Sequence, residues 1–381
     1  MTQTSEKELI AALKGIFTVN LAARPGEKAL VFTDLIPRGL ALDPGARGSR
    51  EGLVRVARAA AEAGRGLGLD VGYHEYEALG SHGTEPGEAL WRMAFGDDTV
   101  DALGASGLLG AIREKRAGER EVEEARAMVG RNSAAAVNMV VALSNYSTSH
   151  TRFRDLLTSA AGARYASMPL FLEEMLWGSM QADWRAVERR CKAVAGAFEG
   201  AVSARVTTAL GTDITLGLTG RPAMLDTGIL DRPGSFSNLP AGEVYMAPVE
   251  GTARGVLILE WAPNRRLSGP LRVRVEGGLA REVVGDDPYG RELEASFNKR
   301  PDNRNVAELG IGTNDRAAMP DSVLESEKIL GTIHIAFGDN SSMGGRVSTP
   351  FHQDFVFFGP TLVVHAGGGE RTVISEGRLL V

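Results

Sequence analysis

The sequence predicts an α/β protein with two domains, on three observations. Helical patterns alternate with short apolar strands over roughly the first 195 residues, which is typical of an open α/β sheet. Beyond about residue 200, short β-like segments bounded by turn residues recur and helical patterns become rare. At 381 residues, the chain is longer than a usual single domain. We therefore expect an N-terminal open α/β sheet domain over residues 1–200 and a β-rich α+β domain over residues 201–381.

Periodicity and turn signals predict the elements of the N-terminal domain. Apolar residues recur at helical spacing in 6–21, and Pro25-Gly26 precedes the apolar run of a strand at 28–33. The segment 34–48 is rich in Pro, Gly and Arg and predicts a loop. The run 138–143 is apolar throughout, as expected for a parallel strand covered on both faces. The other expected elements are helix 51–65, strand 69–74, helix 152–161 and strand 163–166.

The C-terminal domain is expected to consist mainly of strands. A long amphipathic stretch, 170–198, precedes it, and the pattern of the sequence changes there. Alternating or β-branched segments then predict strands at 204–209, 213–218, 255–260, 271–276, 332–337 and 355–358.

Composition and charge exclude several classes of function. The net charge of -6 would repel phosphate backbones, and the arginines are scattered, so no nucleic-acid partner is expected. The one cysteine, Cys191, excludes an intrachain disulfide. Acidic residues at the start of the chain argue against a secretory signal, and no stretch approaches the roughly 18 to 20 apolar residues of a membrane span. We expect a cytoplasmic protein with no membrane partner.

Five ionisable residues lie in short, glycine-punctuated apolar segments of the C-terminal domain: Glu243, Glu308, His334, His352 and Asp354. A charged side chain in such a segment needs a partner to be buried. His352 and Asp354 are two residues apart, so in a strand both face the same side and would chelate one metal. Two histidines and three carboxylates suit one or two divalent ions and metal-assisted hydrolysis.

Each of these residues also has a structural alternative. His352 and Asp354 would form a hydrogen bond that orders the strand end, His334 would be a core histidine, and the glutamates would be exposed loop residues. Glu250, seven residues after Glu243, competes with it as the functional carboxylate. His150 follows a predicted strand and is a candidate substrate contact, since α/β sheets bind ligands at the carboxyl ends of strands. Its alternative is a helix-capping cluster with Ser149 or Thr151.

Four blocks of the C-terminal domain resemble the aminopeptidase T / aminopeptidase S family of metallopeptidases. They span residues 239–250, 307–314, 327–338 and 352–354, in matching order and approximate spacing. The resemblance implies a homodimeric leucyl-aminopeptidase-like enzyme with two zinc or cobalt ions, manganese being a further candidate. It also implies that Glu243, Glu308, His334, His352 and Asp354 are the metal ligands, with Glu308 bridging both ions.

Two features depart from this aminopeptidase pattern. Family members often carry a tyrosine near the metals where this chain has Ser341, which makes Ser341 a candidate substrate contact and puts peptidase activity in doubt. The region is also similar to the dihydroxypyridine ring-opening dioxygenases, which hold one iron with two histidines and a carboxylate. In those enzymes, the resemblance suggests a histidine at the place of Glu308 and an apolar residue at that of His334.

The expected function is therefore metal-dependent hydrolysis of an N-terminal peptide bond or a small amide, as in a metalloprotease. Glu243, Glu308 or Glu250 would move the proton of a metal-activated water. The substrate would be a peptide or a small-molecule amide. The alternatives are a mononuclear non-haem iron ring-cleaving dioxygenase with one Fe²⁺, and a non-catalytic protein that kept the fold.

Overall fold

The computed structural model describes residues 5–318 and 322–381, which form two compact units. Unit 1 comprises the chain up to residue 180 together with residues 228–239, and unit 2 comprises residues 181–227 and 240–381. The first unit is built around a parallel sheet and the second around antiparallel sheets. The chain is thus an α/β protein with sheet-based units, as predicted.

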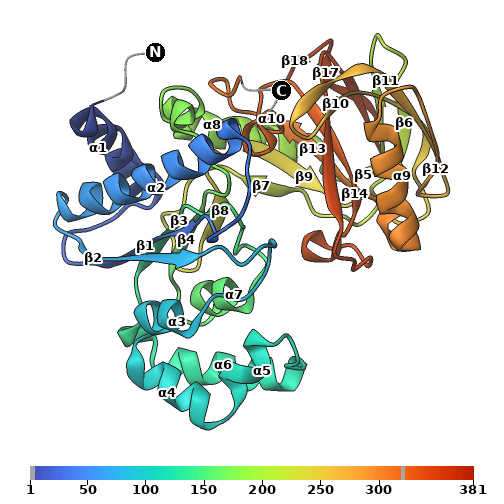
Figure 1. The fold of residues 1–381 in the computed structure, drawn as a ribbon. Helices are drawn as coiled ribbons and strands as arrows, with labels where there is room; N and C mark the ends of the chain where they lie inside the picture. The colour runs from blue at the N-terminus through green and yellow to red at the C-terminus, as the bar shows by residue number, and fades with distance from the viewer. Residues whose placement is uncertain (1–4, 319–321) are drawn as a thin grey trace. The chain divides into compact units, whose positions relative to one another are not determined.

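Unit 1 is a doubly wound α/β sheet. Its five strands are parallel and lie in the order β2-β1-β3-β4-β8. Figure 1 shows α1 and α2 on one face of this sheet and α3 and α7 on the other. The strands are β1 (Lys28–Leu35), β2 (Asp70–Glu77), β3 (Met139–Ala142), β4 (Arg164–Ser167) and β8 (Phe236–Asn238). The helices are α1 (Glu6–Gly15), α2 (Pro44–Arg65), α3 (Glu88–Phe95), α4 (Asp97–Ala105), α5 (Leu108–Arg113), α6 (Glu119–Arg131) and α7 (Arg152–Ser159).

An aromatic cluster fills the core between the sheet of unit 1 and the helices α3 to α7. Phe153 of α7 makes edge contacts with Phe32 of β1 and with Trp91 and Phe95 of α3. All four side chains are fully buried. Such edge-to-face pairs add to the free energy of burying the rings and hold α3 and α7 against the same face.

Unit 2 contains two antiparallel sheets. The larger has the order β12-β11-β10-β6-β5-β16-β17-β18 and the smaller has the order β15-β14-β13-β9-β7. The larger sheet consists of β5 (Ala201–Thr207), β6 (Asp213–Gly217), β10 (Arg254–Ala262), β11 (Arg265–Glu276), β12 (Leu279–Val284), β16 (Thr361–Ala366), β17 (Gly369–Ser375) and β18 (Arg378–Leu379). The smaller consists of β7 (Met224–Asp226), β9 (Glu243–Met246), β13 (Val306–Gly312), β14 (Ile333–Gly338) and β15 (His352–Phe357). The helices are α8 (Trp184–Ala197), α9 (Tyr289–Lys299) and α10 (Val323–Ser326).

Two details of the predicted fold differ from the structure. Helix α2 begins at Pro44, inside the segment predicted as a loop, because Asp43 caps the helix by accepting a hydrogen bond from the backbone N–H of Ala46. The division into units places the main boundary after Met180, whereas we expected it near residue 200. Helix α8 belongs to unit 2 because it packs on β7 and β9.

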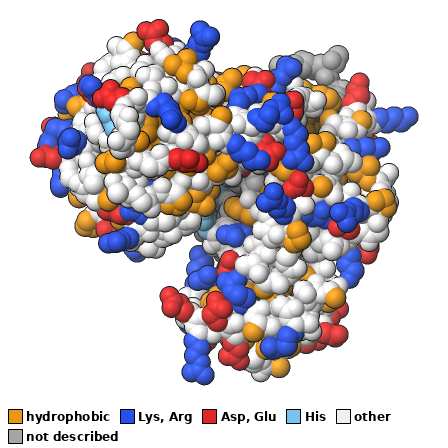
Figure 2. All heavy atoms as spheres, turned by 180° about the vertical axis from the view of Figure 1, so that it is seen from behind, with side chains coloured by type: hydrophobic (Ala, Val, Ile, Leu, Met, Phe, Trp, Pro, Cys, Tyr) orange, Lys and Arg blue, Asp and Glu red, His pale blue; other side chains and the backbone are white. Residues whose placement is uncertain are grey.

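The surface carries both basic and acidic side chains, as the composition indicates. Figure 2 shows basic and acidic side chains on the same face of the molecule. Within the described part of the chain, no helix has both the length and the apolar character needed to cross a lipid bilayer.

Candidate metal centre

The smaller sheet of unit 2 brings the five predicted ligands together on one face. Glu308 lies on β13, His334 on β14, His352 and Asp354 on β15, and Glu243 on β9. Glu308 pairs with Ala336 of β14, which in turn pairs with Asp354 of β15, so these side chains form a row across the sheet. These strands are adjacent only because of the sheet order β15-β14-β13-β9.

Close contacts link the five side chains. The Nε2 atom of His334 lies 3.1 Å from Oε1 of Glu308 and 3.4 Å from Oε2 of Glu243. The Nε2 atom of His352 lies 3.3 Å from Oε2 of Glu308 and 3.5 Å from Oδ2 of Asp354. Glu308 therefore stands between the two imidazoles. Ligand atoms of Glu308, His334 and Asp354 lie within 4.8 Å of one another, as do those of Glu243, Glu327 and His334.

Small residues make room for these side chains on the sheet face. Gly310 of β13 pairs with His334, and a Cβ atom at position 310 would overlap the ring atoms Nε2 and Cε1 of His334. Ala336 separates Glu308 from Asp354 in the cross-strand row. The sheet face is thus shaped to hold an imidazole close to the backbone of β13.

The orientation of His352 suits a metal ligand. Its Nδ1 atom lies 2.8 Å from the backbone carbonyl oxygen of Asp339, which only accepts, so Nδ1–H donates this hydrogen bond. In the neutral imidazole Nε2 is then the nitrogen with the lone pair, and it faces the carboxylates. Metal-binding histidines are commonly oriented by such a hydrogen bond from the other ring nitrogen.

Three buried polar atoms at the site have no hydrogen-bond partner among the described residues: Oε2 of Glu243, Nδ1 of His334 and Oδ1 of Asp354. Leaving buried polar atoms unpaired is costly, and a bound cation would satisfy the carboxylate oxygens. Neutral imidazoles and carboxylates are also the ligands that divalent transition metals prefer. The residues present therefore fit a metal ion.

Burial and mutual charge shift the pKa values of the site in opposite directions. Burial raises the pKa of Glu243 to about 8. Burial would also raise the pKa of Glu308, but hydrogen bonds and charge from His334 and His352 hold it well below the usual range. Burial would lower the pKa of His334, yet the neighbouring Glu308 and Glu243 raise it to about 9. In the metal-free protein, a proton on His334 therefore takes part of the role of a cation.

Sequence reasoning missed two charged residues of this site, Glu327 and Lys328. Lys328 is fully buried, and its Nζ atom lies 3.0 Å from Oε1 of Glu243 and also contacts Oε1 of Glu327. The nearby carboxylates outweigh burial and raise the pKa of Lys328 well above its usual value. The available signal was their position a few residues before the apolar strand β14, which itself carries the candidate ligand His334.

The structure places the other candidate residues elsewhere. Glu250 accepts hydrogen bonds from the backbone N–H of Arg346 and from Nδ2 of Asn340, and it pairs with Arg221. Its contacts are therefore with the 340–346 segment and not with the five ligands. Ser341 donates to the carboxylate of Asp339, 2.9 Å away. It thus helps to order the turn that follows β14.

His150 lies in unit 1 and is exposed, in the segment between β3 and α7. The side-chain oxygen of Thr151 caps α7 by accepting a hydrogen bond from the backbone N–H of Arg154, 3.1 Å away. The helix-capping cluster predicted for this segment is confirmed. A substrate contact by His150 stays a prediction.

Comparison with known proteins identifies the family. The family model described as 2,5-dihydroxypyridine 5,6-dioxygenase (NicX) matches residues 112–381, which include the five candidate ligands. The chain belongs to the 2,5-dihydroxypyridine 5,6-dioxygenase family. It is also 24% identical over 183 residues to the 2,5-dihydroxypyridine 5,6-dioxygenase of Pseudomonas putida KT2440, an alignment that covers 44% of this chain. That alignment spans 52% of the relative, about half of its length.

Two solved structures share the fold of this dioxygenase-family chain. The 2,5-dihydroxypyridine dioxygenase of Pseudomonas putida KT2440 matches with a TM-score of 0.70 and 18% identity, covering 100% of this chain and 99% of the other. Wild-type AmpT of Thermus thermophilus matches with a TM-score of 0.56 and 16% identity, covering 99% and 100%. At these identities the likeness concerns the fold alone. The predicted resemblance to aminopeptidase T therefore holds at the level of the fold.

The predicted function as an aminopeptidase-like hydrolase or protease is wrong. The dioxygenase family model covers most of the chain, and the curated relative carries the same activity in its name. Both findings favour the ring-cleaving dioxygenase that the sequence offered as the alternative. The error arose because the ligand types and their order are shared with the peptidases, whereas the family match extends well beyond them, over residues 112–381.

Substituting Gly310 tests whether the sheet backbone positions His334. In Gly310→Ala the added Cβ atom would displace the imidazole, so we expect the affinity for Mn²⁺ or Co²⁺ to fall by about tenfold or more. Isothermal titration of the folded variant measures this change. Gly269→Ala on β11 is the matched control, since nothing lies within 4 Å of its added Cβ. Unchanged metal affinity in Gly310→Ala would contradict this role.

The pH dependence of stability tests the charge network. The folded-state pKa of His334 is raised from 6.5 to about 9, so its contribution is fully present below pH 6.5 and is lost as the pH rises through 9. The pKa of Glu243 is raised from 4.5 to about 8, so its contribution to stability is also lost as the pH rises through this interval. We expect the free energy of unfolding of metal-free protein to fall by about 1–3 kcal/mol between pH 6.5 and 9.

Urea denaturation at several pH values in the presence of a chelator measures this loss. His334→Gln is the control, because it removes the histidine part of the dependence. Stability that rises over this interval would show that the imidazole is neutral in the metal-free fold.

Proposed function

We propose that this protein is a ring-cleaving dioxygenase that uses one ferrous ion and acts on a hydroxylated, nitrogen-containing aromatic ring. The observation that carries the proposal is the meeting of two imidazoles with Glu308 and Asp354 on one face of one sheet. Two histidines and one carboxylate are the usual ligand set of non-haem iron oxygenases. Membership of the dihydroxypyridine dioxygenase family supports the same reaction class.

The residues at the site would have separate roles in metal binding and proton transfer. His334, His352 and Asp354 would hold the ion, with Glu308 between the two imidazoles. The ion would supply the redox chemistry with dioxygen that amino-acid side chains lack. In the metal-free protein both histidines lower the pKa of Glu308, so this carboxylate is ionised at neutral pH. Burial raises the pKa of Glu243 to about 8 in the same state, so Glu243 would be the carboxylate that exchanges a proton.

The ligand arrangement differs from the one implied by the dioxygenase resemblance. That resemblance places a histidine at position 308 and an apolar residue at position 334. Here position 308 is a glutamate and the second imidazole comes from His334 on the adjacent strand. The same combination of donor types is therefore available from different strands of the sheet.

The position of Lys328 favours a single metal ion at this site, whereas the aminopeptidase resemblance implied two. A second ion would need the group Glu243, Glu327 and His334. The ammonium of Lys328 already contacts one oxygen of each of these carboxylates, and it is fully buried. An ammonium and a metal ion at the same two carboxylates would repel each other strongly in this buried setting. Lys328 thus takes the place of the second cation.

The substrate and assembly follow from the same proposal. The substrate would be a small heteroaromatic ring, and the peptide substrate is not retained. The homodimer implied by the aminopeptidase resemblance stays a prediction, which sedimentation analysis would test. The absence of a nucleic-acid partner also stays a prediction, as does the cytoplasmic location.

Oxygen uptake tests the proposed reaction. Protein reconstituted with Fe²⁺ under anaerobic conditions should consume about one O₂ per molecule of 2,5-dihydroxypyridine, with loss of the ring's ultraviolet absorbance. Zn²⁺-loaded protein and His352→Ala are the controls, and both should be inactive. A panel of mono- and dihydroxypyridines covers related rings. No oxygen uptake with any of them by folded, iron-loaded protein would refute the dioxygenase proposal.

Metal stoichiometry tests the role of Lys328. Elemental analysis should find one ion per wild-type chain even in excess Zn²⁺, whereas Lys328→Met should bind a second ion at Glu243 and Glu327. Removal of one partner from a buried ion pair costs about 3–5 kcal/mol, and the second ion would offset part of this loss. Lys192→Met, at an exposed pair with Glu188, is the control. Two ions in the wild-type chain would contradict this role.

A further inference from the structure

The parallel sheet of unit 1 contains a topological switch point. The strand order is β2-β1-β3-β4-β8. After β1 the chain forms β2 on one side of β1, and it then returns to form β3 on the other side. In open α/β sheets a crevice forms outside the carboxyl ends of the strands at such a point, and ligands bind there. The relevant crevice lies where β1 and β3 end, at the segments that follow residues 35 and 142.

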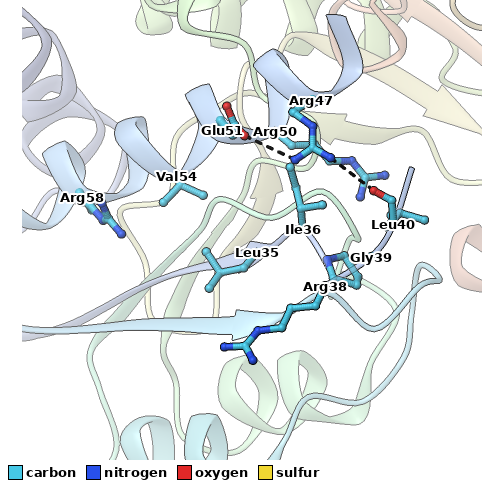
Figure 3. Close-up of a pocket in the computed structure, with 11 residues that line it drawn as sticks. Leu35, Ile36, Arg38, Gly39, Leu40, Arg47, Arg50, Glu51, Val54 and Arg58 are labelled. Carbon is cyan, nitrogen blue, oxygen red and sulfur yellow. Dashed lines mark hydrogen bonds and ion pairs between the residues drawn. The ribbon is translucent and has the colours of Figure 1, made fainter. Parts of the chain in front are cut away.

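A cavity of about 720 Å³ opens beside the carboxyl end of β1. Leu35, the loop from Ile36 to Leu40 and one face of α2 line it. Figure 3 shows these residues, with Leu35, Ile36 and Val54 as its apolar part and four arginines around them. This cavity contains none of the residues that form the candidate metal centre.

The helical spacing of α2 directs three arginines to this cavity. Arg47, Arg50 and Arg58 recur with Val54 at intervals of three or four residues, so they share one face of the helix. Arg38 joins them from the loop after β1. Among the described residues that line the cavity, Glu51 is the one acid. The cavity wall therefore carries an excess of positive charge.

The arginines differ in how far their charge is already compensated. Arg58 is paired with Glu75, 2.7 Å away, and Arg47 lies 3.7 Å from Glu51. Arg38 is exposed and has no ion-pair or hydrogen-bond partner within residues 5–318 and 322–381. Uncompensated guanidinium groups that line one cavity repel each other, and a bound anion would relieve this repulsion.

Arg50 connects the cavity to the strand on the other side of the switch point. Its guanidinium lies 5.4 Å from the ring centroid of Tyr146, which follows β3. Its Nη1 atom is buried and has no hydrogen-bond partner among the residues that the structure describes. The carboxylate of Asp34, at the end of β1, accepts hydrogen bonds from the backbone N–H groups of Asn145 and Tyr146 at 2.7 and 3.0 Å. Arg50 is thus held in place by stacking, and its donor is left for another acceptor.

We propose that this crevice binds the carboxylate or phosphate group of a small anionic molecule. The planar fork of an arginine matches both kinds of oxyanion through paired, charge-assisted hydrogen bonds. Arg38 and Arg50 supply the donors, and Arg47 adds positive charge. The apolar residues Leu35 and Val54 accommodate the rest of a small organic molecule. The proposal is independent of the chemistry at the metal centre.

Titration with malonate and with inorganic phosphate tests the proposal on the full-length, metal-loaded protein. At low ionic strength, calorimetry should detect binding of at least one anion, and Arg38→Gln and Arg50→Gln should each weaken it about tenfold. Arg120→Gln on α6, which lines no part of the cavity, is the control and should bind as wild type does. Tighter binding of malonate identifies dicarboxylates as the ligand class, and tighter binding of phosphate identifies phosphomonoesters.

Two results would overturn the anion site. One is the absence of binding by both anions, and the other is binding that both arginine variants retain in full. If the anion binds to the metal ion instead, the second result is expected, because that binding would survive both substitutions. Arg38 is exposed, so Arg38→Gln gives folded protein for this comparison even if Arg50→Gln is unstable.

Discussion

The burial of several charges on one face of a five-stranded sheet is the constraint on which the structure of unit 2 depends. His334, Glu308, Glu243 and Lys328 are all less than 9% exposed. An isolated charge in such a place would be strongly unfavourable, so each needs opposite charge within contact distance. The strand register, the small residues beside the ligands and the position of Lys328 are all consequences of this requirement.

The same requirement explains how the sheet prepares a site for a cation. Carboxylates outnumber the fixed positive charge of Lys328, and in the metal-free state protons on the histidines offset the difference. A divalent ion would take over that role when the protons leave, so metal binding and proton release are linked. Under the proposed function, Lys328 would limit the number of ions. Charge balance, more than the number of potential ligands, would then determine the metal content.

The sequence predicted which residues gather on one sheet face better than it predicted their arrangement. The spacing of His352 and Asp354 was enough to place both on one strand face, because alternation in a strand is strictly local. The approach of Glu243 and Glu308 depends on the order β14-β13-β9, which is a long-range property that periodicity does not contain. Lys328 was overlooked for the same reason, since a lysine is ordinarily exposed and one of its two carboxylate partners, Glu243, is distant in the sequence.

Local sequence signals also failed to predict some of the helices of unit 1. The composition of residues 34–48 indicated a loop, yet Asp43-Pro44 is a helix start, with a capping side chain followed by proline at the first helical position. The segment 88–131 forms α3 to α6, which were not predicted. These helices are short and separated by glycines such as Gly96 and Gly107, so their hydrophobic periodicity is interrupted.

The hydrogen bond from His352 to the carbonyl oxygen of Asp339 has a consequence for the way this protein tolerates mutation. The acceptor is a backbone atom, so substitutions at position 339 leave it in place provided that the turn keeps its path. The path of the turn depends on the carboxylate of Asp339, which accepts hydrogen bonds from Ser341 and from the backbone N–H of Thr349, and on the buried Asn340. Substitutions at its exposed positions, Ser342, Arg346 and Ser348, would therefore leave the imidazole aimed. Substitutions at Asp339 or Asn340 would move it indirectly, through the backbone.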